Sequence, residues 1–304
     1  MTAVAGPRTP DAAETVDLAA LGRPISGPGA LTRDWRRFWH LTFNLAKTSW
    51  KMRFFGSALG YLWQLLRPLL LFGVLYIFFT DVAKINRGEH GPSGAFYGSQ
   101  LLAAIVLFTF IQEATMGSVR AVVDNEALVR KIEFPRLAIP LSTVLVALFN
   151  LTLNMVVVLI FATIQGVRPM LSWIEIPIVI AITAVLATGI SLLLSSAFVY
   201  FRDIQPIWEV ALQVLFYASG VMIPAAVVAQ HFGAHSTTMK LYMSNPVSAL
   251  LEQLKHSAIN NAVWGPAGYG GYKWVAVPMA IIFGLLIVGF WVFNRTAPYV
   301  AENI

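Results

Sequence analysis

Cysteine is absent from this chain of 304 residues, and charged side chains make up only 12% of it. Without cysteine there is neither a disulfide framework nor a thiolate metal site. The shortage of charge excludes a soluble domain of this length, because 57% of the residues are hydrophobic and too few charged groups remain to cover them. The composition therefore predicts an integral membrane protein.

Motifs for chemistry are also missing. The chain contains no G-x-x-x-x-G-K-[ST] loop and no G-x-G-x-x-G after a strand pattern, so we do not expect it to hydrolyse ATP by itself. No set of serine, histidine and acid lies in a recognisable local motif. His231 and His235 stand one helical turn apart, but no third ligand follows at a telling spacing. We therefore predict no catalytic residue, no metal site and no cofactor in this chain.

Long apolar runs dominate what is present. A helix needs roughly 20 apolar residues to cross a bilayer, where every backbone polar group must be paired within the segment. The runs lack the alternation with period two that barrel strands show. Six of them lie near residues 61–80, 96–117, 138–165, 174–200, 207–224 and 274–293. The predicted fold class is an all-α membrane protein with six transmembrane helices, whose transmembrane domain covers 57–296.

Positive charge predicts the orientation. With the N-terminus in the cytoplasm, most of the 21 lysines and arginines fall in cytoplasmic segments, as the positive-inside rule requires. Both termini are therefore predicted to be cytoplasmic, with 1–30 a disordered leader that has no cleavable signal and 297–304 a short tail. The formal net charge of +6 is explained by the anionic inner leaflet, so no nucleic-acid partner is expected.

An amphipathic helix in the cytoplasmic membrane interface is predicted for residues 31–56. At about 100° per residue, apolar and aromatic side chains gather on one side and basic or polar ones on the other. The helix is either a plain surface anchor or also a contact that transmits motion from a partner subunit. The apolar side holds Trp35, Phe38, Trp39, Phe43, Leu45, Ala46 and Trp50, and the polar side holds Arg33, Arg37, His40, Asn44, Lys47 and Lys51.

Two cytoplasmic loops and one long outer segment connect the spans. The mixed-charge stretch 120–136 is predicted to contain a short helix, which is either a docking element or an ordinary solvated loop. The turn at 200–203 leaves room only for a short contact. In the outer segment 225–273, Asn245 is predicted to cap a helix over 246–259 whose apolar stripe lies on, or dips into, the outer membrane face. Short outer helices are thus predicted between spans five and six.

Ionisable and aromatic residues inside the spans are the candidate functional residues. Arg67 and Glu113 lie at similar depth near the cytoplasmic side, and we expect an ion pair between them. The alternatives are that Arg67 extends alone to the interface, or that it contacts the pyrophosphate of a lipid-linked substrate. Interior aromatics either line a path that grips sugar rings or pack in the core; they are Phe72, Tyr76, Phe216 and Tyr217.

Three stretches carry a resemblance to a known family. They are Leu59-Gly60-Tyr61-Leu62-Trp63 followed by Pro68-Leu69, then Phe134-Pro135-Arg136 followed by Pro140-Leu141, and finally Tyr200-x-Arg202-Asp203-Ile204. In order and spacing they resemble the start of span one and the two cytoplasmic loops in the permease subunits of polysaccharide ABC exporters, the O-antigen and teichoic-acid type. The likeness covers roughly residues 33–293.

This resemblance implies a transport subunit. Such a permease forms a homodimer, joins two copies of a separate ABC subunit that binds ATP and Mg²⁺, and exports a lipid-linked glycan across the cytoplasmic (inner) membrane of a bacterium. By position, the residues that couple to the ATPase would be Asn125, Glu126, Leu128, Arg130 and Lys131, with Tyr200, Arg202 and Asp203 in the second loop. The channel, formed mainly by spans one and five, would be lined by Trp63, Phe72, Tyr76, Phe216 and Tyr217.

Two other interpretations stay open. An ABC exporter of drugs or small lipids would have the same architecture and the same contacts with membrane lipids. A membrane-embedded glycan-modifying enzyme, such as an acyltransferase, would need a catalytic histidine or aspartate near a membrane face, and no convincing one is present.

Overall fold

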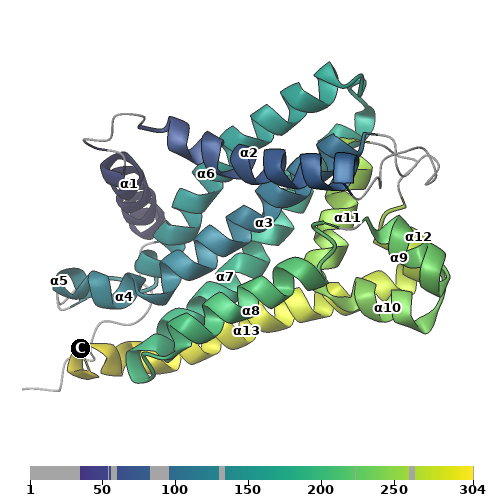
Figure 1. The fold of residues 1–304 in the computed structure, drawn as a ribbon. Coiled ribbons are helices and arrows are strands. Elements are labelled where there is room, and N and C mark those ends of the chain that lie inside the picture. The colour runs from purple at the N-terminus through teal and green to yellow at the C-terminus, as the bar shows by residue number, and fades with distance from the viewer. Residues whose placement is uncertain are drawn as a thin grey trace, which may run out of the picture.

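The computed structural model describes residues 35–53, 55, 60–82, 96–129, 134–222, 224–259 and 264–303. Within these ranges the chain is helical and contains no strand (Figure 1). The α-helices are α1 (Trp35–Arg53), α2 (Leu62–Ile77), α3 (Tyr97–Val119), α4 (Ala121–Asp124), α5 (Glu126–Val129), α6 (Ala138–Ile164), α7 (Ile176–Tyr200), α8 (Ile204–Ala218), α9 (Ala225–Phe232), α10 (Thr237–Ser244), α11 (Pro246–Ala258), α12 (Pro266–Gly270) and α13 (Tyr272–Asn303). A π-helical turn, Phe78–Val82, extends α2, and a 3₁₀ turn, Leu171–Glu175, precedes α7. The predicted leader, 1–30, lies outside the described residues.

Five helices in the described part of the chain are long and apolar enough to cross a membrane. They are Leu62–Val82, Tyr97–Val119, Ala138–Ile164, Leu171–Tyr200 and Tyr272–Thr296, and each matches a predicted span. The predicted all-helical membrane class is therefore confirmed. The remaining predicted span, 207–224, falls on α8, whose 15 residues extend about 22 Å and fall short of a hydrocarbon core of about 30 Å. The count of six spans stays a prediction.

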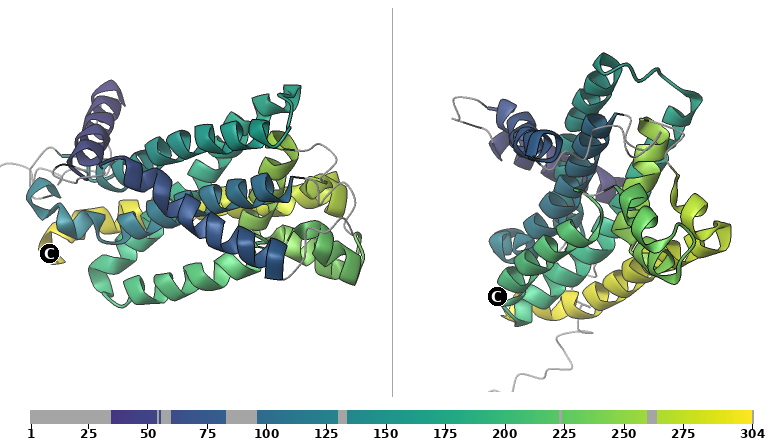
Figure 2. Two further views of the ribbon diagram at one scale, coloured as in Figure 1. Left: turned by 45° about the horizontal axis from the view of Figure 1, so that its top comes forward. Right: turned by 45° about the vertical axis from the view of Figure 1, so that its right-hand side comes forward.

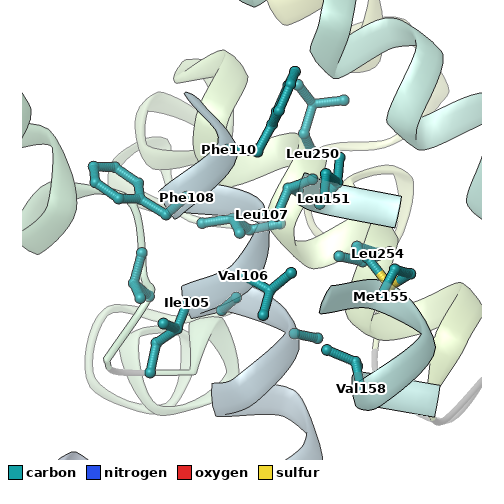
Figure 3. Packing of buried hydrophobic residues seen from close by; sticks show 14 of the residues in the cluster. Ile105, Val106, Leu107, Phe108, Phe110, Leu151, Met155, Val158, Leu250 and Leu254 are labelled. Atoms are coloured by element: carbon teal, nitrogen blue, oxygen red, sulfur yellow. The ribbon is translucent and has the colours of Figure 1, made fainter. Parts of the chain in front are cut away.

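Helix α3 is the centre of the bundle. It packs against α2, α6, α7, α8 and α11, and most of its residues are buried. A helix with no polar face is one that neighbours cover on every side. Figure 3 shows how its apolar side chains meet those of α6 and α11. The labelled residues are Ile105, Val106, Leu107, Phe108 and Phe110 from α3, Leu151, Met155 and Val158 from α6, and Leu250 and Leu254 from α11.

Glycine sets the closest helix contact, between α7 and α13. A Cβ added to Gly289 would lie 2.4 Å from the Gly189 carbonyl oxygen, and one added to Gly189 would lie 2.7 Å from the Leu286 nitrogen. Small residues at a membrane helix crossing let the backbones approach, so dispersion contacts replace the hydrophobic driving force that lipid removes. These two helices make the most extensive pairing in the fold.

The two ends of the bundle carry different elements. At one end lie α1, α4, α5, the turn before α8 and the C-terminal end of α13, whereas α9, α10 and α12 gather at the other (Figures 1 and 2). The predicted assignment of these two ends to the cytoplasm and the outside stays a prediction. Helix α13 continues through Asn303, so most of the predicted tail, 297–304, is helical.

Helix α1 packs on α6 through a narrower stripe than the predicted apolar face. Phe38, Thr42 and Ala46 are its buried residues, whereas Trp35 and Phe43 are exposed. Thr42 tolerates burial because its Oγ1 donates to the Phe38 carbonyl at 2.8 Å. The exposed aromatics are free to lie at a membrane boundary, and the predicted interfacial location stays a prediction.

The predicted outer helix is present as α11. The Asn245 side chain accepts from the Val247 nitrogen at 3.0 Å, so the predicted cap is confirmed. Helix α11 dips into the bundle against α3 and α7, and most of its residues are buried. Its buried side chains include Glu252 and Lys255, which pair with each other at 2.7 Å.

Candidate functional site

A cavity of about 640 Å³ lies between α2, α3 and α8. Its walls mix apolar, aromatic and polar groups. They are Arg67, Pro68 and Leu71 from α2; Phe108, Thr109, Gln112, Glu113 and Met116 from α3; and Glu209, Leu212, Gln213, Phe216 and Tyr217 from α8. A concave apolar site with a few polar groups is the usual form of a small-molecule or lipid site.

Arg67 is the cation of this cavity. Its side chain is exposed, and among the described residues no carboxylate lies within 4.0 Å of it. The neighbouring Pro68 fixes its own φ inside α2 and is buried, so it helps to direct the cavity face of the helix. An unpaired guanidinium with planar donors suits an anion that offers several oxygens, such as a phosphate.

Glu113 is held by other partners than the predicted one. Its Oε2 accepts from Asn150 Nδ2 at 2.8 Å, and Arg53 Nη1 lies 4.0 Å from the same oxygen. The predicted ion pair with Arg67 is therefore wrong for this structure, although both residues line one cavity. The physical reason is that Asn150 and Arg53 already satisfy the carboxylate from the side of α6 and α1.

The predicted channel residues fall in four places. Phe216 and Tyr217 lie on the cavity wall, as does Phe108, whose ring meets Phe216 edge-on with centroids 5.1 Å apart. Phe72 is buried against Tyr76 and Phe161 instead, with ring centroids within 5.4 Å.

The other two predicted channel residues, Tyr76 and Trp63, also lie away from this wall. Tyr76 borders a second, smaller cavity of about 260 Å³ beside Tyr97 and Gln165. Trp63 is exposed and lines neither space. A substrate role for any of the five residues stays a prediction.

The first predicted coupling segment is formed by α4 and α5. Asn125 separates these one-turn helices, and its Nδ2 donates to the Ala121 carbonyl at 2.8 Å. Helix α4 packs on α6 and α7 and α5 on α13, so the segment is fixed to the bundle from behind. Glu126 begins α5, and Leu128 is half-buried on it. Arg130 and Lys131 lie outside the described residues.

The second predicted coupling turn joins α7 to α8. Tyr200 ends α7 and is exposed, as are Arg202 and Asp203 in the turn. The Asp203 carbonyl accepts from the Ile207 nitrogen at 3.2 Å, which closes the first turn of α8. Because α4 contacts α7, both predicted coupling segments belong to the same end of the bundle.

Arg136, between these segments and α6, is buried with part of its guanidinium unpaired. The residue is 5% exposed, and its Nε and Nη1 have no hydrogen-bond partner in the described part of the chain. Burial lowers the pKa of this guanidinium. Burying charged nitrogens without partners is costly, so this side chain destabilises the end of the bundle that carries α4 and α5.

At the opposite end of the bundle, polar and aromatic side chains lie around α10, α11 and α12. Burial raises the pKa of the Tyr242 phenol, and the negative charge of Glu252 raises it further. The same two causes raise the pKa of Tyr269. His235 contacts the Tyr269 carbonyl at 3.2 Å and stacks on Trp264. Within the described residues no group of three metal-ligating side chains forms.

Several residues at or near the site were not predicted from the sequence. Asn150 lies in an apolar span and was not singled out, although a polar amide at membrane depth is itself a functional signal. Gln112, Glu209 and Gln213, which line the cavity, were not singled out either. Glu209 and Gln213 are four residues apart and so share a helix face, which the sequence does reveal. No pattern reveals that Trp50 of α1 reaches Asn150.

Comparison with known proteins agrees with this architecture. Residues 40–234 match the ABC-2 type transporter family, which is well over half of the chain. One similar protein is the O-antigen export system permease protein RfbA of Klebsiella pneumoniae, 24% identical over 83% of this chain and 90% of its own length. Another is the RfbA of Myxococcus xanthus, 27% identical over 73% of this chain and 81% of its own length. The matched segment contains the cavity and both predicted coupling segments, and the chain belongs to the ABC-2 type transporter family of membrane proteins.

Proposed function

We propose that this chain is the transmembrane subunit of an ABC exporter that carries a lipid-linked polysaccharide across the cytoplasmic membrane. Two similar proteins are named O-antigen export permeases, and the likeness extends over most of their length as well as most of this chain. The sequence has no phosphate-binding loop, so a separate ATPase subunit supplies the energy. An exporter of drugs or small lipids is the competing function.

The observation that carries this proposal is the composition of the cavity. Arg67 offers a cation to the phosphate groups of a lipid carrier, and Phe108, Phe216 and Tyr217 offer faces on which sugar rings stack. Gln112 and Gln213 add amides that hydrogen-bond hydroxyl groups. The cation and the amides together suit a phosphate-bearing glycan better than an uncharged apolar drug.

A second copy of the chain would complete this site. The outer face of α8 exposes an apolar stripe of Ile207, Val210, Val214 and Tyr217, and the neighbouring face of α2 exposes Leu70, Val74 and Ile77. Both faces flank the open cavity. In a homodimer these stripes would face the partner copy, and two cavities would merge into one path.

The ATPase subunits would dock at the end that carries α4, α5 and the turn 201–203. Those segments protrude from the bundle beside the C-terminal end of α13 (Figure 1). The charge bias of the sequence supports a cytoplasmic location for that end and for both termini. Short helices packed firmly on the spans would pass ATPase motion to α6, α7 and α13.

The test is export by the host. Deleting the gene should abolish a surface polysaccharide and leave its lipid-linked precursor inside, and the wild-type gene should restore export. Arg67→Leu at matched protein level should restore it poorly, whereas Arg168→Leu, which alters an exposed arginine outside the cavity, should restore it fully. Normal surface glycan together with a new drug sensitivity would instead favour the competing function.

A further inference from the structure

A chain of hydrogen bonds runs from α1 through α6 to the cavity wall. Trp50 Nε1 donates to Asn150 Oδ1 at 2.9 Å, and Asn150 Nδ2 donates to Glu113 Oε2 at 2.8 Å. An indole N–H only donates and a carboxylate only accepts, so the amide between them has one possible orientation. Asn150 is 2% exposed, which removes water as a substitute partner. The chain therefore fixes where the Glu113 carboxylate points.

The same turn of α1 also contacts the residue that precedes α2, the helix that forms another wall of the cavity. The Trp50 ring stacks on Tyr61, with centroids 4.5 Å apart, directly before α2 begins. Arg53, one turn further along α1, places its Nη1 4.0 Å from Glu113 Oε2. One turn of the N-terminal helix thus touches the start of α2, which carries Arg67, and through Asn150 reaches α3.

These contacts determine which charges in the cavity are paired. Glu113 is 13% exposed and lines the same space as Arg67, yet its charge is satisfied from the opposite side. We propose that Trp50 and Asn150 are positioning residues that hold Glu113 away from Arg67, so that Arg67 stays available to a phosphate-bearing group of the substrate. This inference rests on the proposed function, because it assigns roles within the proposed substrate cavity.

A movement of α1 would then control the affinity of the cavity for anions. If α1 shifts relative to α6, the hydrogen bonds of Trp50 and Asn150 open and the carboxylate turns to Arg67, which lines the same cavity. Pairing neutralises the guanidinium, and a bound anion leaves. The exposed aromatics Trp35 and Phe43 on the same helix would tie this movement to the membrane surface.

One test needs no ligand. Arg67→Gln, Glu113→Gln and their combination are compared by thermal unfolding of the purified chain, in the wild type and in a Trp50→Phe background. The phenylalanine keeps an aromatic ring against Tyr61 and removes the N–H donor together with the pyrrole part of the indole. We expect additive shifts in the wild type, and in Trp50→Phe a coupling of a few degrees between the two residues. Equal coupling in both backgrounds would overturn the proposal.

A second test measures anion binding with farnesyl diphosphate, a short prenyl diphosphate, by calorimetry. Trp50→Phe should weaken binding about tenfold, which corresponds to about 1.4 kcal/mol. Adding Glu113→Gln should restore the affinity, because the competing carboxylate is gone. Trp39→Phe is the matched control, since it makes the same change on the exposed side of α1 and should bind like the wild type. A merely structural Trp50 would give no recovery in the double variant.

The two tests separate the two ideas. If the wild type fails to bind farnesyl diphosphate, the proposed role of the cavity fails, while the unfolding comparison still decides whether Trp50 controls the approach of Glu113 to Arg67. If the probe binds and Arg67→Gln abolishes binding but Trp50→Phe does not weaken it, the proposed function stands and the positioning role of α1 is wrong.

Discussion

The Lys255 ammonium lies 2.7 Å from the Glu252 carboxylate inside the protein, and the two side chains are 2% and 1% exposed. The ammonium also donates to the Gly220 carbonyl at 3.0 Å, just beyond the end of α8, where Gly220 takes a left-handed conformation with φ 72°. A second hydrogen bond, from Asn245 Nδ2 to Ser219 Oγ at 3.1 Å, supports the same junction. These contacts hold α11 against the C-terminal end of α8, which forms one wall of the cavity.

Removing Lys255 alone should be strongly destabilising. Lys255→Met leaves the Glu252 charge buried and unpaired, which costs about 3 to 5 kcal/mol, and the double variant with Glu252→Gln should recover part of that loss. The measurement is thermal unfolding in detergent. Lys273→Met, at the exposed start of α13, should change little. An unchanged unfolding temperature for Lys255→Met would mean that the pair does not stabilise the fold.

Substitution at the α7–α13 crossing should disrupt their packing. In Gly289→Ala the new methyl group would lie 2.4 Å from the Gly189 carbonyl oxygen, so the helices must separate, at about 1 to 3 kcal/mol. Gly284→Ala is the control on the same helix, because nothing lies within 4 Å of its added Cβ. We expect a lower unfolding temperature for Gly289→Ala and an unchanged one for Gly284→Ala. Equal behaviour of the two would contradict the close crossing.

The predicted ATPase contact is tested at Leu128. Leu128→Glu places a charge on the half-buried side chain of α5, and co-purification of the ATPase subunit should fall while the bundle stays folded. Leu241→Glu, on the exposed surface of α10 at the other end, should leave co-purification unchanged. Normal association of the Leu128 variant would place the contact elsewhere.

Topology is accessible because the chain has no cysteine of its own. Single cysteines at positions 5 and 300 should resist an impermeant maleimide in intact cells, since the charge bias places both ends inside. A cysteine at Thr238, exposed on α10, should react. Labelling at position 5 or 300 would show that this end lies outside the cell and would contradict the predicted orientation.

Arg136 gives a prediction of opposite sign. Its Nε and Nη1 are buried without a partner among the described residues, so Arg136→Met removes a desolvation penalty and should stabilise the isolated chain by about 1 to 3 kcal/mol. The matched change Arg202→Met, at an exposed position in the α7–α8 turn, should have no such effect. A large loss of stability for Arg136→Met would reveal an anionic partner for this group.

The spans followed from the sequence because hydropathy and length are local properties. Leu141 to Ile164 is mostly apolar and carries no charged residue, and the bilayer requires a helix there whatever the neighbours are. The same holds for the capped outer helix, where Asn245 and the following apolar stripe are visible in consecutive residues. Such features depend on nearby positions only.

The site followed less well because it depends on contacts between distant residues. Similar depth of Arg67 and Glu113 could be read from the sequence, but rotation about the helix axes and the competing Asn150, 37 residues beyond Glu113, could not. Phe72 and Phe216 have the same chemical character, yet one faces the core and the other the cavity. Only the packing of α2 and α8 against α3 decides between those fates.

The burial of α11 has a consequence for how the protein is made. Its 13 residues are too few to cross a bilayer, and Glu252 and Lys255 each add about 2.5 to 3.5 kcal/mol to the cost of placing it in lipid. During synthesis this segment would therefore stay out of the bilayer until α3 and α7 have inserted. It can then pack against these two helices instead of against lipid. The buried pair would form late, after membrane insertion, and a variant without it should accumulate as a fully inserted chain with a loosely packed outer end.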